Sequence, residues 1–299
     1  MPSLFAHLTN LVFRCMPQDK PGQPHDYVAE RKRNDRRPPK PPKGVTVRLG
    51  ELGGLSAEFI QKPGNKNGTI FYIHGGGFTV GSARDRRAVC QYITANHGYD
   101  CVSFNYRLAP ENLWPAPLED SLTAYTALLK TGVSPKEIVF MGESADGTLA
   151  LSLALLLKEK GLLQPRALAA LSPCVTQADR FPSYTENAST DYMLRTSIAE
   201  GKIKVVFGNR ANDLEYLRQP TISPLYGDFT ELPPVFFSVS DTEVLLDDSI
   251  TLYEKLKSHG HQTALDIRHG VCHAFQVFTA MPEARQALAV IFRTLEEWA

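Results

Sequence analysis

From residue 45 onward the chain repeats short apolar runs that are rich in branched and aromatic residues. Eight of these runs have the length and composition of strands, at residues 45–49, 57–62, 69–74, 101–106, 137–142, 168–172, 234–240 and 264–269. Helical patterns separate the later runs, at residues 84–97, 115–131, 144–160 and 247–259. Strands that alternate with helices are typical of a mostly parallel sheet, because parallel strands need long crossover connections. The pattern therefore predicts the α/β class.

The N-terminal residues carry a helical pattern of their own. Residues 3–15 read SLFAHLTNLVFRC, with Ser3 available as the N-cap. One face of this helix would hold the apolar side chains Leu4, Phe5, Leu8, Leu11, Val12 and Cys15. Polar residues interrupt the apolar run and Arg14 follows it, which is unlike a signal peptide. We expect an amphipathic helix, with binding to a membrane surface as the weaker alternative.

Two other segments lack the strand pattern. Residues 17–43 are rich in Pro, Arg and Lys, which neither a helix nor a central strand tolerates well, so we expect an extended arm or linker. Its basic run from Arg31 to Lys43 is expected to be solvated. The second segment, residues 175 to about 218, has an apolar pattern around IAEGKIKVVFG and lies between two predicted strands. An insertion at that place can form a lid over a site.

Composition narrows the class of protein. The chain has 299 residues, and 32 Lys and Arg balance 32 Asp and Glu, so the near-zero net charge argues against a nucleic-acid partner. The five cysteines are scattered and have no metal-ligand spacing, as expected in a reducing cytoplasm. No apolar run reaches the ~20 residues that span a bilayer. We expect one globular core in the cytoplasm, with no stable membrane insertion and no metal or other cofactor.

The sequence EIVFMGESADG places Ser144 where a strand changes into a helix. A serine on such a turn projects its hydroxyl away from the sheet, and the helix N-terminus favours negative charge there. Gly142, Ala145 and Gly147 are the small neighbours that a tight turn needs. Asp146, however, stands where the G-x-S-x-G motif has its second glycine, and its carboxylate could crowd the strand or repel a developing oxyanion. We expect Ser144 to be a nucleophile whose turnover Asp146 slows.

A glycine-rich sequence, YIHGGGFTVGS at residues 72–82, follows another predicted strand. Its flexible glycines can turn their amides into a site. We expect the amides of Gly76, Gly77 and Ala145 to form an oxyanion hole, in which one donor contributes roughly 3 kcal/mol of transition-state stabilisation. His74 is expected to brace this loop without reacting.

A hydrolytic serine needs a base, and the sequence HGVCHAFQVF offers His273 just after a predicted strand. His269 is the competitor. The two histidines also form H-x-x-x-H, but the glutamate of the metalloprotease motif is missing, which argues against a metal site.

The base needs an acid that holds its other ring nitrogen, and SVSDTEVLLDD supplies four candidates. Asp247 and Asp248 begin the next predicted helix, where acids serve as N-terminal charge. Asp241 and Glu243 lie in the loop after the strand, and both remain candidates on this argument.

Five blocks of the sequence stand together in one order: HGGGFTVGS at 74, NYRLAPENLWPAPLEDS at 105, GESADGTLALSLAL at 142, LSPC at 171 with SPLYGDFTELPP at 223, and VLLDDS before CHAFQVF. They resemble the hormone-sensitive-lipase-like esterases of the α/β-hydrolase superfamily. The resemblance covers roughly residues 45–295, and YRLAPE is specific to this branch, where it looks like a structural support behind the oxyanion loop. Glu143, Cys174 and Asp146 depart from the family pattern, and only Asp146 is expected to affect the chemistry.

The resemblance implies an α/β-hydrolase core at residues 45–299, with an eight-stranded sheet. Residues 1–44 and the insertion at about 175–218 would together form a helical cap. Laying the family sequence D-P-L-R-D-E over E-V-L-L-D-D favours Glu243 as the triad acid, with Asp241 as the alternative. The last strand of such a sheet is an exposed edge that could pair in a homodimer.

These observations predict a serine carboxylesterase that hydrolyses short- to medium-chain acyl esters through an acyl-enzyme. Its expected partners are the small-molecule ester substrate and, through the edge strand, a second copy of the chain. One alternative is a weak or inactive binding protein on the same fold, since fold does not fix function. Another keeps the triad but makes the protein a deacetylase, an amidase or an acyltransferase.

Overall fold

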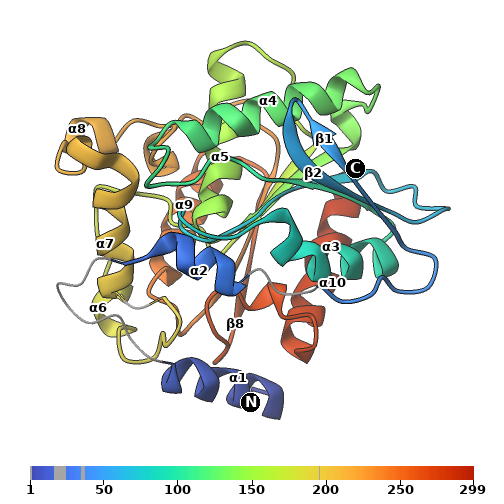
Figure 1. Cartoon of the computed structure of the whole chain (residues 1–299). Helices are drawn as coiled ribbons and strands as arrows, with labels where there is room; N and C mark the ends of the chain where they lie inside the picture. The colour runs from blue at the N-terminus through green and yellow to red at the C-terminus, as the bar shows by residue number, and fades with distance from the viewer. Residues whose placement is uncertain (1, 17–24, 35–37, 195) are drawn as a thin grey trace.

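Eight strands form a single sheet at the centre of the molecule (Figure 1). The computed structural model describes residues 2–16, 25–34, 38–194 and 196–299. Each predicted run is a strand: β1 Thr46–Leu52, β2 Leu55–Gln61, β3 Thr69–Ile73, β4 Asp100–Phe104, β5 Ile138–Glu143, β6 Ala167–Leu171, β7 Val235–Ser240 and β8 Thr263–Arg268. Their order is β1-β2-β4-β3-β5-β6-β7-β8, and only β2 runs antiparallel to its neighbours. The predicted mostly parallel sheet is confirmed.

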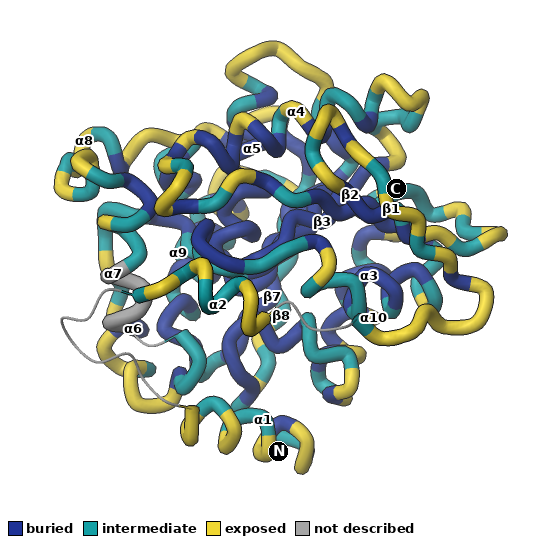
Figure 2. Tube along the Cα trace, viewed as in Figure 1, coloured by how far each residue is buried: buried dark blue, intermediate teal, exposed yellow. Residues whose placement is uncertain are grey.

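Helices cover both faces of the sheet, with α4, α5 and α9 on one face and α3 and α10 on the other. Their bounds are α3 Ala83–Asn96, α4 Ala116–Lys130, α5 Ala145–Glu159, α9 Leu246–Ser258 and α10 Pro282–Glu297. Successive side chains of a strand point to opposite faces, so Phe71 of β3 packs with α4 and α5 while Tyr72 packs with α3 and α10. Figure 2 shows this central layer as buried. Burial on both faces explains why the central strands β3, β5, β6 and β7 are mostly apolar runs.

The carboxyl ends of the parallel strands meet at one edge of the sheet. The loops after β3, β5, β7 and β8 therefore lie close together, although their residues are far apart in the sequence. In open α/β sheets this edge is where sites form. Four predicted site elements fall on these four loops: the glycine-rich segment, the serine, the acid and the histidine.

The insertion between β6 and β7 folds into short helices beside that edge (Figure 1). They are α6 Ser183–Glu186, α7 Thr196–Phe207 and α8 Leu214–Leu217. The sequence around IAEGKIKVVFG forms α7, as its apolar pattern predicted. Val206 and Phe207 of α7 are buried, and the Val206 carbonyl accepts a hydrogen bond from the Trp114 amide at 3.0 Å. The insertion is thus anchored on the loop that follows β4.

The expectation of an extended arm at residues 17–43 is wrong in part. Tyr27–Asn34 form helix α2, because the prolines of the segment lie outside it and the Asp26 carboxylate caps its first turn at the Ala29 amide. Residues 17–24 and 35–37 lie outside the described residues. Arg31 of the run that was predicted to be solvated instead pairs with Glu111. Its guanidinium group also donates to the carbonyl oxygens of Thr79, in the glycine-rich segment, and of Ala109, in the segment YRLAPE.

The N-terminal helix α1, Leu4–Cys15, has the predicted Ser3 cap. It packs through Ala6 and Phe13 on the segment after β8 and on α10, so it supports the histidine loop more than it covers the insertion. The predicted apolar face is exposed. In the described part of the chain, no helix is both long enough and apolar enough to cross a membrane.

Candidate active site

Ser144 lies at the turn between β5 and α5. Its φ is 60°, in the left-handed region that residues other than glycine seldom adopt. Its amide donates to the Leu171 carbonyl of β6 at 2.8 Å. An added Cβ on Gly142 would lie 2.3 Å from the Asp146 carbonyl oxygen, and one on Gly147 would lie 3.2 Å from the Leu171 carbonyl. This turn therefore requires glycine at 142 and leaves little room for a side chain at 147.

The Ser144 hydroxyl lies 2.9 Å from Nε2 of His273. Nδ1 of His273 lies 2.6 Å from Oε2 of Glu243. A carboxylate at Nδ1 accepts a hydrogen bond from that nitrogen, which leaves Nε2 free to accept the serine proton. Three side chains from the ends of β5, β7 and β8 thus form one hydrogen-bonded chain.

The two acids that the sequence left open make different contacts. Glu243 is fully buried against His273, whereas Asp241 pairs with the exposed His269 and accepts from the Gly270 amide at 2.8 Å. Glu243, which the family resemblance favoured, is the acid that reaches the histidine.

Hydrogen bonds fix the Glu243 carboxylate in place. Its Oε1 accepts from the Ser172 hydroxyl and the Ser240 amide, each at 2.8 Å, so Oε2 is left for His273. Burial raises the pKa of Glu243, although the nearby His273 opposes this. Burial lowers the pKa of His273, but the charge and hydrogen bond of Glu243, together with the charges of Asp191 and Glu143, outweigh it and the net pKa is raised. The pair therefore favours the imidazolium that forms when the serine gives up its proton.

The glycine-rich loop after β3 faces this triad. Gly76 and Gly77 have φ of 140° and 64°, a backbone that glycine adopts without strain. Among the described residues, no acceptor is paired with either amide. The Ala145 amide, at the start of α5, also lacks an intrahelical partner. His74 is buried and its ring stacks on Tyr106, with burial lowering its pKa to about 3, so it braces the loop as a neutral ring, as predicted.

Glu143, next to the nucleophile, holds the glycine-rich loop. Its Oε1 accepts from the Gly75 amide at 2.7 Å and pairs with Arg86, and its Oε2 accepts from the Tyr72 hydroxyl at 2.8 Å. Glu143 thereby fixes the distance between the loop and the serine turn. Sequence reasoning treated it as irrelevant to the chemistry, because nothing local to GESADG shows that its side chain reaches another strand's loop.

Comparisons with known proteins agree with this geometry. The sequence model for the α/β-hydrolase fold matches residues 70–277. An esterase from Acinetobacter venetianus is 33% identical over 248 residues, which cover 83% of this chain and 80% of that protein. The chain belongs to the α/β-hydrolase family.

Comparison with solved structures shows which branch of the α/β-hydrolase family the chain resembles. The crystal structure of EstE5 soaked with p-nitrophenyl butyrate is 28% identical, has a TM-score of 0.88 and covers 99% of both chains. An esterase of the bacterial hormone-sensitive lipase family matches equally well, with a TM-score of 0.88 over all of this chain and 99% of that one, at 28% identity. The predicted resemblance is confirmed, and this α/β-hydrolase is a carboxylic ester hydrolase of the hormone-sensitive-lipase type.

The insertion of this esterase also holds the loop that carries the acid. The Asn187 side chain donates to the carbonyl oxygens of Asp241 and Glu243, at 3.1 and 2.8 Å. The Asp191 carboxylate accepts from the Val244 amide at 3.0 Å. Sequence reasoning missed both residues, because two polar residues in an insertion without a strand pattern or motif carry no recognisable signal.

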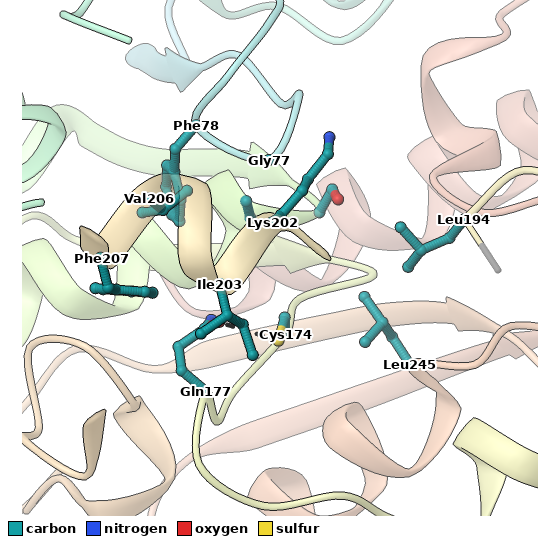
Figure 3. A pocket seen from close by; sticks show the side chains of 12 residues that line it. Gly77, Phe78, Cys174, Gln177, Leu194, Lys202, Ile203, Val206, Phe207 and Leu245 are labelled. Carbon is teal, nitrogen blue, oxygen red and sulfur yellow. Dashed lines mark hydrogen bonds between the residues drawn. The ribbon is translucent and has the colours of Figure 1, made fainter. Parts of the chain in front are cut away.

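A cavity of about 60 Å³ opens beside the serine of this esterase (Figure 3). It is lined by Gly77, Phe78, Ser144, Ala145, Cys174, Gln177, Leu194, Lys202, Ile203, Val206, Phe207 and Leu245. Helix α7 supplies four of these residues, so the insertion forms one wall of the cavity. Burial raises the pKa of Cys174 to about 12, which keeps its thiol protonated. The described residues contain no group of three or more His, Cys, Asp or Glu placed to bind a metal ion.

Asp146 of the esterase is completely buried in the first turn of α5. Among the residues that the structure describes, neither of its carboxyl oxygens has a hydrogen-bond partner in ordinary geometry. Burial raises its pKa well above the usual value, although the Tyr106 hydroxyl opposes this. Burial thus favours the neutral form of Asp146, in which the repulsion of an oxyanion that the sequence suggested is weaker.

We expect Asp146→Asn to change how stability depends on pH. The native state keeps the Asp146 proton at pH values where the unfolded chain has lost it, so wild-type stability falls as pH rises from about 4 toward the raised native pKa. The variant has no proton to lose at this position. The difference between its free energy of unfolding and that of the wild type should therefore grow by up to about 1.4 kcal/mol per pH unit in that range. Urea unfolding of both proteins from pH 4 to pH 8 measures it. Parallel stability curves would contradict a raised pKa at Asp146.

Proposed function

We propose that this esterase hydrolyses short- to medium-chain acyl esters of small alcohols through a covalent acyl-enzyme. Ser144 is the nucleophile, His273 the general base and Glu243 the residue that orients His273. The observation that carries the proposal is the hydrogen-bonded chain from the Ser144 hydroxyl through the imidazole to a buried carboxylate.

The reaction follows from this chain. Nε2 of His273 takes the Ser144 proton while Oγ bonds to the ester carbonyl carbon, and the carbonyl oxygen becomes an oxyanion that the amides of Gly76, Gly77 and Ala145 stabilise. The carbon–oxygen bond to the alcohol then breaks, and His273 protonates the leaving alcohol. A water molecule, deprotonated by the same imidazole, attacks the acyl carbon and releases the acid, and Ser144 regains its proton.

The size of the cavity supports a short acyl chain. About 60 Å³ beside Ser144 accommodates only a few carbon atoms while α7 closes one wall. We therefore expect kcat/KM for p-nitrophenyl esters to be highest for acetate or butyrate and to fall at least about tenfold for laurate. A CH₂ group that does not fit in the cavity gains none of the ~0.8 kcal/mol that burial of a CH₂ supplies, and forcing it in adds strain. A rise in kcat/KM from butyrate to laurate would contradict this.

Two further assays separate the esterase from its alternatives. A fluorophosphonate should label the wild-type protein covalently at Ser144, whereas a binding protein would stay unlabelled. Matched p-nitroanilides should be hydrolysed much more slowly than the p-nitrophenyl esters, whereas an amidase would cleave both.

The same proposal extends to the protein's surroundings. All five cysteines are free thiols, which supports a reducing compartment such as the cytoplasm. The outer edge of β8 belongs to the last strand of the sheet and exposes Ile267, so a second copy could pair there. Size-exclusion chromatography with light scattering tests the homodimer.

A further inference from the structure

Arg31 of helix α2 contacts the glycine-rich loop. Its Nε donates to the Thr79 carbonyl oxygen at 2.7 Å, and one terminal nitrogen donates to the Ala109 carbonyl oxygen at 2.6 Å. The two terminal nitrogens also donate to the two carboxylate oxygens of Glu111, each at 2.9 Å. A guanidinium group carries its N–H donors in a rigid planar fork. Arg31 therefore joins α2, the loop after β3 and the segment after β4 at one point.

The turn that Arg31 holds is the one that presents the amides assigned to the oxyanion hole. The Thr79 amide donates to the Gly76 carbonyl oxygen at 3.3 Å, which closes a turn from Gly76 to Thr79. The two central residues of this turn, Gly77 and Phe78, have φ of 64° and 59°, the sign of φ that a type I′ turn requires. Both residues also line the cavity beside the serine (Figure 3).

Phe78 makes this turn depend on outside contacts. A residue other than glycine seldom adopts a positive φ, and such a conformation persists where its surroundings enforce it. The Phe78 carbonyl oxygen accepts a hydrogen bond from the Ala109 amide at 2.8 Å. Arg31 holds the carbonyl oxygens of Thr79 and Ala109, so its guanidinium group secures both sides of that bond. Without the guanidinium group the turn can relax, which moves the amides of the oxyanion hole.

The ion pair with Glu111 orients the guanidinium group. The side chains of Arg31 and Glu111 are 24% and 46% exposed, and pairs as exposed as this add little to stability. The two parallel hydrogen bonds instead fix the plane of the fork. They also lower the pKa of Glu111, so its carboxylate is charged at neutral pH. This geometry suits a group that positions other groups.

We propose that Arg31 is a positioning residue for the oxyanion hole, through which helix α2 of the N-terminal segment supports catalysis. Arg31 acts through Thr79 and its turn, and it touches neither the substrate nor the reacting atoms. This inference rests on the proposed function, in which the amides of Gly76 and Gly77 stabilise the oxyanion. The bond changes of the reaction are those already described.

The first test is the effect of Arg31→Ala on the two kinetic constants for p-nitrophenyl butyrate. We expect kcat to fall at least about tenfold and KM to change less than about threefold, because the oxyanion forms only after the substrate has bound and a displaced donor stabilises it less. Arg33→Ala is the matched control, because Arg33 is an exposed arginine on the same helix. It should leave both constants as in the wild type.

A short alkyl trifluoromethyl ketone separates positioning from a loss of folded enzyme. The Ser144 oxygen bonds to its carbonyl carbon, the serine proton passes to His273, and the ketone oxygen becomes an oxyanion in the hole. The inhibition constant Ki of this compound does not depend on how much of the enzyme is folded. We expect Ki for Arg31→Ala to rise by about the factor by which kcat/KM falls.

Arg31→Lys gives a second variant with a smaller change at this position. Lysine keeps the positive charge beside Glu111, but one ammonium group cannot reproduce the planar fork that meets two carbonyl oxygens and a carboxylate. We expect its Ki to lie between those of the wild type and Arg31→Ala. Arg33→Ala should bind the ketone as the wild type does.

The outcomes separate this inference from the proposed function. If the wild type hydrolyses no p-nitrophenyl ester, the proposed function fails and this inference fails with it. If the wild type is active and both Arg31 variants keep its Ki, the positioning role is overturned and the proposed function stands. A lower kcat would then reflect less folded enzyme, and the amount of protein labelled by a fluorophosphonate would fall by the same factor. A rise in Ki as large for Arg33→Ala as for Arg31→Ala would also overturn the role.

Discussion

Replacing Ser144 with alanine is expected to lower kcat for p-nitrophenyl butyrate by about 10⁴- to 10⁶-fold. The variant has no oxygen to bond to the acyl carbon, so the acyl-enzyme cannot form. The residual rate would come from the oxyanion donors acting on a bound water. The hydroxyl lies 2.9 Å from Nε2 of His273, which makes it the oxygen that the base can activate.

Ser152→Ala is the control for this substitution. Ser152 lies farther along α5, is buried, and its hydroxyl has no hydrogen-bond partner among the described residues. Its loss should therefore leave kcat almost unchanged. Activity retained by Ser144→Ala, or phosphonate label retained on that variant, would show that another residue is the nucleophile.

His273→Ala in the Ser144→Ala background should add little to the defect. The serine and histidine act as a unit in which each is useless without the other, so their effects on kcat do not add. A double variant slower than either single variant by a further factor of 10³ or more (roughly the loss of an independent catalytic group) would mean that His273 has a separate role.

Replacing Glu243 with glutamine is expected to lower kcat by about 10⁴-fold. The amide has nearly the same shape, but it can present an N–H to Nδ1 of His273 and so favour the tautomer that cannot accept the serine proton. It also removes the negative charge that stabilises the imidazolium. Asp241→Asn is the matched control and should change kcat less than about tenfold, because Asp241 contacts His269 and not the base. The reverse order of effects would assign the triad acid to Asp241.

The pH profile gives Glu243→Gln an independent readout. Activity requires a neutral His273, so wild-type kcat/KM should rise as pH increases through a pKa above the ordinary histidine value of 6.5. Burial lowers this pKa, and the charge and hydrogen bond of Glu243 are the largest of the contributions that together raise it, so removing the Glu243 charge should lower it. The acid limb of the variant should therefore lie at lower pH than that of the wild type, at a much reduced rate.

Asp146 shows how a local motif can mislead. The motif G-x-S-x-G predicts that a side chain at its last position disturbs the turn. In the structure the close approaches occur at Gly142 and Gly147, and the Asp146 side chain is buried with the Tyr106 hydroxyl near its carboxyl group. The cost of the aspartate is thus the burial of a polar group, which protonation reduces.

The sequence by itself determined the class of fold and the chemistry. Apolar runs mark the central strands, which are buried on both faces, and the branched and aromatic residues of the outer runs mark the remaining strands, so all eight were predictable. Ser144 and His273 were predictable too, because each follows a strand whose carboxyl end must reach the same edge of the sheet. The apolar runs and the residues that directly follow them are features of short stretches of sequence, so they can be recognised without knowledge of the tertiary contacts.

Only the tertiary structure decided which groups touch. Glu243 and Asp241 are two residues apart and chemically alike, and only the packing of β7 against β8 turns one toward His273 and the other toward His269. The hydrogen bond from the Gly75 amide to Glu143 and the position of Lys202 in the cavity also depend on contacts between segments that are distant in the chain. The physical reason is that a side chain's hydrogen bonds and burial are set by the elements packed around it, and those contacts leave no periodic trace in the sequence.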